Sequence, residues 1–512
     1  MKSKIMLVGV VLAALIMSSV GLVSAQAPTA FYVGFQIQNL SATNAATVAI
    51  QYYKQDGTGN GDSNYSQTIS IPAGRSKTIL CNLSTDLSAD ILAPAPAVRG
   101  SSTFVGSVII SSDQEVAAIA NEAASVSNPY GAASYDGVSS GQASATVYAP
   151  LISKIGQPDT AINIQNPNGS SVSVVVQYVP GVYGVAYTAP AASLPAYGSA
   201  IWAVPASALD GSGRFLGSAK ITSTGGNVAV IVDEIYTAPG TARHNGRQSY
   251  NGFSSGSTKA VAPLIQKNDS GVWYTGLQVV NLGPGSATVR VTYNGTQGTI
   301  SGSSCNPTTP VSALTETDFA LAENGSKTIL AEQGGALNSV ALASLGCFRG
   351  AASVEVVGGT GKVAAIVSVA GKGVASLAAY RAFDPTIATQ TVSVPLIEKY
   401  VGTSGNYGWS TGTQVANLGT GTATITGTFS VSCGGTPTTI TDVASGVSTN
   451  SSATFLQLNG FATGSFGTNK QCLGSATFTS NQNIGAIVQQ SFFGSPNPFT
   501  GDTLMAFEAF NR

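Results

Sequence analysis

Stretches in which apolar and polar residues alternate run along much of the chain and recur in the same order. In the clearest copy, a strand-like stretch at residues 261–265 is followed by others at 276–283 and 287–293. Alternation with a period of two places successive side chains on opposite faces of a β-strand. Clusters of Gly, Asn, Ser and Pro separate the stretches, as turns require. The pattern predicts an all-β protein whose sheets each bury one face and expose the other.

Several phrases repeat along the chain. A Pro-Leu-Ile phrase, followed two residues later by a lysine, begins at Pro150, Pro263 and Pro395. Other phrases occur four times: a strand ending in asparagine, a hairpin, and a strand pair of the type Gly-Ser then Val-Ala-Ala-Ile. A fixed order of repeats is typical of tandem modules. Seven or so short strands in roughly 110 to 130 residues is the pattern of a two-layered β-sandwich.

We therefore divide the chain into unit one (residues 26–146), unit two (147–259), unit three (260–391) and unit four (392–512), after a signal peptide at 1–25. Unit one lacks the first Pro-Leu-Ile strand. A sandwich without its first strand exposes an edge that can pair with another chain. Two interpretations stay open: unit one accepts a strand from a neighbouring copy, or the Pro-Leu-Ile phrase is only a connection between units.

The N-terminus has the features of a secretory signal. Lys2 and Lys4 precede an apolar run at residues 5–17, and small residues lead up to Ala25. This order predicts export and cleavage after Ala25. The alternative is an uncleaved membrane anchor, but the run is shorter than a span usually needs. We expect no membrane span in the mature chain.

Charge is sparse. Only 9% of residues are charged and the formal net charge is −1, whereas about 25% is average for globular proteins. No basic stripe is present, so nucleic acid is not an expected partner. A surface with few charges favours association between copies. The alternative is that an extracellular β-protein rich in Ser and Thr simply needs few charges.

Four of the five cysteines form two matched pairs, Cys305 with Cys347 in unit three and Cys433 with Cys472 in unit four. Their equivalent positions predict two disulfides, in keeping with an exported protein. Zinc is the rival interpretation, but the CxxC spacing is missing. Cys81 is left over, either as a buried small side chain or as a thiol bonded to another molecule.

Two kinds of surface site are weaker candidates. Oxygen-bearing side chains at alternate positions around a glycine resemble a calcium loop, although Gln67 stands where a bidentate acid is expected, and a plain hairpin tip is the alternative. The candidate calcium ligands are Asp56, Thr58, Asn60, Asp62 and Asn64. Asn-x-Ser/Thr sequences are candidate glycosylation sites. They occur at Asn39, Asn64, Asn82, Asn168, Asn268, Asn294, Asn324 and Asn450.

Catalytic chemistry is not expected. No nucleophile–base pair or phosphate loop is visible, and the one histidine, His244, has no second metal ligand beside it. Asp233 and Glu234 are adjacent on one predicted strand, so they point to opposite faces and cannot act on one substrate atom. The sequence predicts no enzyme and no cofactor besides the weak calcium candidate.

The strand ending in Asn-Leu-Gly, the Ala-x-Val-x-Val-x-Tyr strand and the Pro-Ala-Gly-x-Ser-x-Thr hairpin resemble the immunoglobulin-like repeat modules of bacterial and archaeal cell-surface proteins. The resemblance implies four tandem immunoglobulin-like β-sandwich domains and a role as a stalk, adhesin, surface-layer component or filament subunit. These motifs are turn and core positions, so they carry no catalytic residue.

The sequence therefore favours a secreted structural protein of the cell surface, a subunit of an extracellular filament, sheath or surface layer that assembles with copies of itself. The alternative is an adhesin or carbohydrate-binding protein whose partners are cell-surface glycans. In that case loops that lead to Trp273 and Trp409 would present aromatic rings, although a core or lid position is the plainer interpretation of both.

Overall fold

The computed structural model is all-β in the part of the chain that it describes. It describes residues 10–14, 31–59, 65–80, 106–124, 131–156, 158–236, 246–300, 305–332, 335–372, 376–401, 408–457, 471–493 and 502–511. Within these ranges the strands form antiparallel sheets, and one turn of 3-10 helix lies at Ala206–Ala208. None of the described segments is a helix long and apolar enough to cross a membrane.

The first half of the chain supplies these strands. Strand β1 (Val10–Ala14) comes before unit one and joins its sheet. The strands within unit one are β2 (Phe31–Asn39), β3 (Ala46–Lys54), β4 (Ser66–Ile71), β5 (Ser76–Leu80), β6 (Gly106–Ser112), β7 (Val116–Ala124), β8 (Ala132–Asp136) and β9 (Val138–Ser139). In unit two they are β10 (Thr146–Lys154), β11 (Pro158–Gln165), β12 (Val172–Tyr183), β13 (Tyr187–Thr188), β14 (Ala192–Leu194), β15 (Ser199–Ala203), β16 (Phe215–Thr224), β17 (Ala229–Tyr236) and β18 (Arg247–Asn251).

The second half follows the same order. In unit three the strands are β19 (Lys259–Lys267), β20 (Trp273–Asn281), β21 (Ala287–Gly298), β22 (Thr309–Thr315), β23 (Phe319–Leu321), β24 (Ser326–Leu330), β25 (Cys347–Gly359), β26 (Val363–Gly371) and β27 (Leu377–Arg381). In unit four they are β28 (Thr389–Lys399), β29 (Gly408–Asn417), β30 (Ala423–Cys433), β31 (Thr436–Val447), β32 (Ser452–Leu456), β33 (Cys472–Phe493), β34 (Leu504–Glu508) and β35 (Phe510–Asn511).

Each unit places its strands in two layers. In unit three the outer layer has the order β19-β25-β21-β22 and the inner layer the order β24-β20-β26-β27. Unit one repeats this with β4-β3-β6-β1-β9 and β5-β2-β7-β8. In unit four the long strand β33 belongs to both layers, because it pairs with β28 and β30 through its first part and with β29 and β34 through its second. In unit two the strands form one continuous sheet in the order β13-β12-β16-β10-β11-β17-β18, in which a single residue pair, Lys154 with Asp159, joins β10 to β11. The fold is thus all-β and sandwich-like.

The repeated asparagine holds the two layers together at one end of each unit. Asn281 is fully buried, and its Nδ2 donates hydrogen bonds to the carbonyls of Gly285, Leu321 and Ala322, 2.8–3.1 Å away. Asn417 makes the equivalent bonds to Gly421 and Val447. A buried amide that satisfies several turn carbonyls at once fixes the turn and the facing hairpin in one geometry, which explains why the residue recurs.

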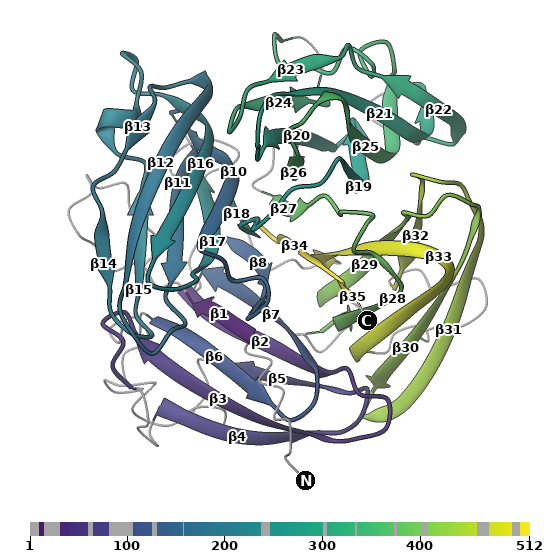
Figure 1. Ribbon diagram of the computed structural model, residues 1–512. Helices are drawn as coiled ribbons and strands as arrows, with labels where there is room; N and C mark the ends of the chain where they lie inside the picture. The colour runs from purple at the N-terminus through teal and green to yellow at the C-terminus, as the bar shows by residue number, and fades with distance from the viewer. Residues whose placement is uncertain are drawn as a thin grey trace.

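The four units are arranged around a common centre (Figure 1). Unit one lies at the bottom of the view, unit two at the left, unit three at the top and unit four at the right, so that the last unit meets the first. The inner strands β8, β18, β27 and β34 contact one another in a closed circle in that order. Tandem repeats alone do not predict this closure, in which the last unit returns to the first.

The hydrophobic clusters of the units interlock around the ring. The last residue of each Val-Ala-Ala-Ile type phrase is at most 2% exposed, and it packs in the core of the preceding unit. Ile231 lies in the cluster of unit one, Ile366 in that of unit two, Ile487 in that of unit three and Ile119 in that of unit four. Each unit therefore completes the core of its neighbour.

The expectation that every sheet leaves one face in water is wrong for the inner layer. All five residues of β8, β18 and β34 are buried, and so are the polar residues Gln36 and Gln38 of β2. The physical reason is the ring: the second face of each inner layer packs against the next unit. Polar side chains there bond across the junction, as Gln36 does through its Nε2, 2.6 Å from the carbonyl oxygen of Pro395.

Candidate functional site

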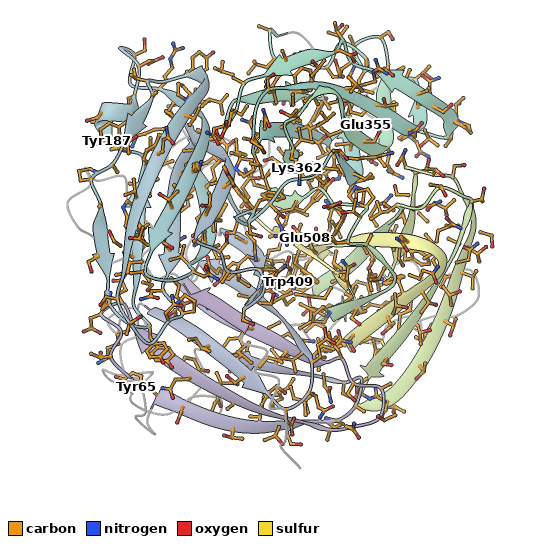
Figure 2. The ribbon with its side chains drawn as sticks, viewed as in Figure 1. Tyr65, Tyr187, Glu355, Lys362, Trp409 and Glu508 are labelled. Carbon is orange, nitrogen blue, oxygen red and sulfur yellow. A yellow bond between two sulfur atoms is a disulfide. The ribbon has the colours of Figure 1, made fainter. Side chains whose placement is uncertain are left out.

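The centre of the ring is the place where the chain concentrates buried charge. Each of the four central strands ends in a polar residue that follows an aromatic one. These residues are Asp136, Asn251, Arg381 and Glu508. Figure 2 shows Glu508 near the middle of the molecule, whereas Tyr65 and Tyr187 lie at its outer edge. The axial core, as we name the four strands and the side chains between them, is the first candidate site.

Arg247 ties units one and two together in the axial core. Its guanidinium forms ion pairs with Glu122 of unit one and with Asp233 of its own unit, where the atoms are 3.1 Å apart. The three side chains are each 1% exposed. Asp233 also accepts hydrogen bonds from Ser249 and Asn163. A buried arginine between two carboxylates is a paired charge cluster, and the further donors hold Asp233 in place.

Arg381 does the same at the other end of the central strands. Its Nε donates to Glu508 over 2.7 Å, and its guanidinium lies 4.0 Å from Asp136. Burial, together with the nearby charge of Glu508, raises the pKa of Asp136 well above its ordinary value. The three residues come from units three, four and one, so this cluster joins three units at one point.

Asp502 of unit four joins units two and three by accepting hydrogen bonds from their backbone. Its carboxylate accepts hydrogen bonds from the amide nitrogens of Arg247, Leu377 and Leu504, at 2.8–3.0 Å. Burial raises the pKa of Asp502 well above its ordinary value, although the three N–H donors favour the ionised form. One side chain of unit four therefore positions the first residues of the central strands of units two and three.

A hollow of about 380 Å³ opens at the Arg381 end of the axial core. Asp136, Arg381 and Glu508 line it, and Phe253 and Phe383 stand at partly exposed positions beside them. The arginine is already paired with Glu508, and the phenylalanines pack on the small clusters between units. These contacts make the wall of the hollow a structural junction.

The junction between units four and one carries a hydrogen-bonded chain of long polar side chains. Gln490 donates from Nε2 to Glu398, and Asn121 donates from Nδ2 to Gln490 Oε1 over 3.1 Å. Glu398 is 7% exposed, and burial raises its pKa to about 7, partly opposed by the hydrogen bond from Gln490. The folded chain therefore holds a proton on Glu398 that the unfolded chain releases at lower pH.

Replacing Glu398 with glutamine is expected to stabilise the protein at about pH 8. Because the pKa of Glu398 is higher in the folded than in the unfolded chain, the free energy of unfolding falls as the pH rises from the ordinary glutamate pKa toward 7. Each pKa unit corresponds to about 1.4 kcal/mol, so Glu398→Gln should gain about 3 kcal/mol at pH 8 and little at pH 4. Urea unfolding across this pH range measures the effect.

An exposed glutamate, Glu355, is the matched control for that experiment. Glu355→Gln should change the free energy of unfolding at pH 8 by less than about 0.5 kcal/mol, as is usual for surface substitutions. An identical pH profile for Glu398→Gln and the parent protein would contradict the assignment of a protonated Glu398 to the folded state.

The second candidate site is the first-strand slot of unit one, which we define as the groove between β6 and β9. Strand β1 occupies it: Val10 lies opposite Ile110 and Ala14 opposite Gly106 on β6, and Val11 lies opposite Val138 on β9. In the other units the first strand pairs in the same way with β16, β25 and β33. Residues 10–14, within the predicted signal peptide, thus take the place of the strand that unit one lacks.

The first strands of the other units differ from β1 in one respect. At each Pro-Leu-Ile phrase the pairing register shifts, as in a β-bulge, and β1 has no such shift. Proline has no N–H for the ladder, so the bulge accommodates it. A tyrosine hydroxyl of the central strand binds the backbone of the bulged leucine: Tyr250 binds Leu151 and Tyr380 binds Leu264. In units two to four the Pro-Leu-Ile phrase is therefore part of a sheet.

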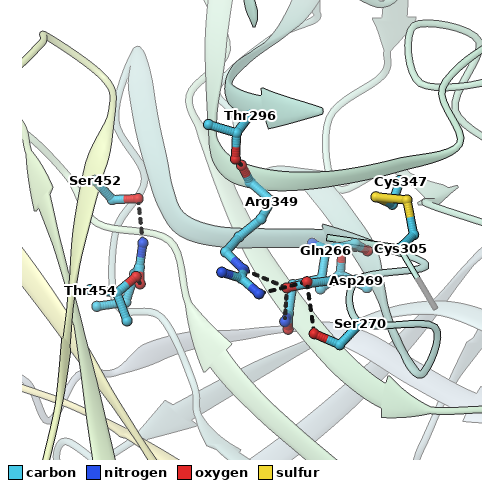
Figure 3. Close-up of polar contacts among 11 residues, drawn as sticks. Gln266, Asp269, Ser270, Thr296, Cys305, Cys347, Arg349, Ser452 and Thr454 are labelled. Atoms are coloured by element: carbon cyan, nitrogen blue, oxygen red, sulfur yellow. Dashed lines mark hydrogen bonds and ion pairs between the residues drawn. A yellow bond between two sulfur atoms is a disulfide. The ribbon is translucent and has the colours of Figure 1, made fainter. Parts of the chain in front are cut away.

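Both predicted cysteine pairs are disulfides. Cys305 is bonded to Cys347, and Cys433 to Cys472. Figure 3 shows the first pair beside Asp269, whose buried carboxylate binds the Nε and Nη2 of Arg349, 2.6 Å away, and Gln266. The loop that leads to Trp273 is thus fastened at Asp269 and at the disulfide. A loop held in this way presents its tryptophan in one orientation.

The two tryptophans expected near binding loops begin their strands. Trp273 starts β20 and packs against the core of unit three. Trp409 lies at the start of β29, and its ring meets that of Phe492 edge-on with centroids 5.7 Å apart. Part of the loop before Trp409, residues 402–407, lies outside the described residues. Both indoles are half-buried and packed.

The weaker surface candidates have diverse surroundings. Asp56 Oδ1 accepts hydrogen bonds from the backbone and hydroxyl of Thr58, at 2.9 and 2.6 Å. Asn39 is fully buried, and its Nδ2 donates to the carbonyls of Asn44 and Ile71, so the folded chain offers no accessible amide there. The partly exposed candidates are Asn168, Asn268, Asn294, Asn324 and Asn450. The candidates outside the described residues are Asn60, Asp62, Asn64, Cys81, Asn82 and His244.

Residues of the axial core were not predicted as a site. Asp233 was noted in the sequence, and it and Glu234 do serve different surroundings, since Asp233 binds Arg247 and Glu234 lines a separate hollow between units two and three. The described residues include no group of three or more His, Cys, Asp or Glu placed to hold a metal ion. In comparisons with known proteins, no protein-family model and no curated protein matches the chain.

Proposed function

We propose that the protein is a secreted structural subunit of an extracellular filament, sheath or surface layer, built of four immunoglobulin-like sandwiches. Copies join when a strand of one enters the first-strand slot of another. The observation that carries the proposal is the origin of β1. It comes from residues upstream of Ala25, where cleavage of the signal peptide is predicted. Removing it would leave β6 and β9 with unpaired backbone groups, and such edges pair with strands of other chains.

The closed ring supports the same proposal. The interlocking isoleucines occupy the junctions between units within one chain, so these junctions are not available for joining copies end to end. The last strand is engaged as well, because β35 pairs with β28 of its own chain. An emptied first-strand slot would offer one incoming strand two neighbours, β6 and β9. Sparse charge on the outside of the units lowers the repulsion between copies.

Electron microscopy of the purified chain 26–512 tests the proposal. We expect polymers for this chain and monomers for the full-length chain, whose slot is filled. A synthetic peptide with the sequence of Thr146–Lys154, the equivalent strand of unit two, should shorten the polymers, and a scrambled peptide of the same composition should not. Monomers at every concentration of chain 26–512, or polymers indifferent to the peptide, would show that the slot does not join copies.

A further inference from the structure

A second hollow, of about 240 Å³, lies at the junction between units two and three. Unit two contributes Ser153, Glu234 and Gln248 to its wall, and unit three contributes Gln278 and Ser368. Its mouth includes the partly exposed rings of Tyr236 and Tyr274. We name it the two–three hollow.

The hollow exists because of short side chains at positions that are long in another junction. Where units four and one meet, Glu398, Gln490 and Asn121 form a continuous hydrogen-bonded chain. The equivalent residues where units two and three meet are Ser153, Glu234 and Ser368. Two serines thus replace a glutamate and an asparagine, and the space that those side chains fill in one junction stays open in the other.

Polar atoms without a protein partner face this space. Gln248 Oε1, Gln278 Nε2 and the hydroxyls of Ser153 and Ser368 are buried and make no hydrogen bond to any residue that the structure describes. Both glutamines are 2% exposed. Buried polar groups are nearly always satisfied by protein, water or ligand. Four buried polar groups without a described hydrogen-bond partner line this hollow, and they include a donor and an acceptor. They indicate that a polar molecule binds there.

The chemistry of the wall selects the class of ligand. An amide oxygen accepts, an amide nitrogen donates and the serine hydroxyls do both, which suits a molecule rich in hydroxyl groups. No lysine or arginine is among the described lining residues, while Glu234 and Glu332 are, so the wall offers nothing to an anion. The tyrosines at the mouth provide flat apolar faces for the C–H side of a sugar ring. The volume is below that of a typical drug-sized pocket, and it suits one small ring.

We propose that the two–three hollow binds a small neutral polyhydroxylated molecule, either a free sugar or a single sugar residue of a glycan. Ordered water alone is the competing occupant. This inference does not depend on assembly through the first-strand slot. A sugar site would give a structural subunit a means of adhering to glycans on neighbouring cells or on its own surface.

A variant that copies the filled junction provides the test. Ser153→Glu, Glu234→Gln and Ser368→Asn together reproduce the Glu398, Gln490 and Asn121 set in the two–three hollow. Saturation-transfer NMR with free monosaccharides and their methyl glycosides measures binding, and a glycan array identifies a glycan-borne source. We expect dissociation constants of about 1 mM or lower for at least one sugar, and at least tenfold weaker binding by the triple variant. Ser448→Asn, at an exposed position, is the control and should bind like the parent protein.

The outcomes separate the occupants clearly. No transfer from any sugar would assign the hollow to water and overturn the proposal, and so would equal binding by the triple variant. Binding of methylammonium in place of sugars would overturn the ligand class, since it would assign the site to Glu234 and Glu332. If the triple variant does not fold, as judged by circular dichroism, Ser368→Asn alone narrows the hollow and should still weaken sugar binding.

Discussion

Replacing Arg247 with methionine is expected to lower the free energy of unfolding by about 3–5 kcal/mol, because it leaves a buried charge cluster without its cation. Glu122 and Asp233 would remain in the axial core, each 1% exposed. Methionine keeps much of the volume of arginine, so the loss would be electrostatic and not a cavity effect. Urea unfolding followed by circular dichroism measures it.

The exposed ion pair of Arg290 with Asp318, whose side chains are 48% and 34% exposed, supplies the control. Arg290→Met should leave stability nearly unchanged because surface pairs are screened by water. Converting Glu122 to glutamine and Asp233 to asparagine in the Arg247→Met background should recover part of the loss. If Arg247→Met destabilises no more than Arg290→Met, the axial core does not hold the ring together.

Removing the disulfide of unit three by Cys305→Ser with Cys347→Ser is expected to cost about 3–4 kcal/mol on the chain-entropy estimate. The two cysteines are 42 residues apart in the sequence and both are buried. Opening this loop gives the unfolded chain more freedom, and it also releases the anchor of the loop that carries Asp269. Urea unfolding of the double variant and of the parent protein measures the cost.

The second disulfide gives an internal comparison. Cys433 and Cys472 are 39 residues apart, so Cys433→Ser with Cys472→Ser should cost about as much as the first pair by the same estimate. Because the effect on the unfolded chain is nearly equal for the two loops, any difference between the variants reports the native contacts that each bond supports. A change below about 1 kcal/mol for both would contradict the entropic account.

The strands and the disulfides could be predicted because the sequence shows the first by local alternation and the second by repetition of cysteine positions. Alternation around Val289, on an outer-layer strand, fixes which side chains enter the core, and four aligned copies make the turns recognisable. The cysteine pairs were predictable since Cys347 and Cys472 stand at the same place before the same strand. Neither inference needs knowledge of how the units are placed.

The ring could not be predicted in the same way, although traces of it are in the sequence. The phrase from Val116 to Ala120 is apolar without alternation, which is typical of a strand buried on both faces. The equivalent ends of the central strands carry Asp136, Arg381 and Glu508, which are opposite charges at matching positions in a chain that has few. On separate units these charges would have no partners. Where the units meet, Arg381 pairs with Glu508 and lies near Asp136.

The first strand of unit one was hidden for a different reason. The apolar run that includes residues 10–14 has the pattern of a signal peptide, so a strand of the fold was not expected there. The sequence showed only that unit one lacks its first strand. In the structure β1 takes that place, and it comes from the predicted signal peptide. The polar atoms of the two–three hollow were hidden as well, because serine on a strand is ordinary until the partner junction is known.

The interlocked cores also set the order of events during synthesis. Unit one is made first, yet its cluster is completed by Ile231, and the cluster of unit four, made last, is completed by Ile119 of the first. In a chain made from its N-terminus, Ile119 on β7 therefore stays uncovered until the strands of unit four have been made. For an exported chain, that interval is when a chaperone outside the membrane would have most to protect.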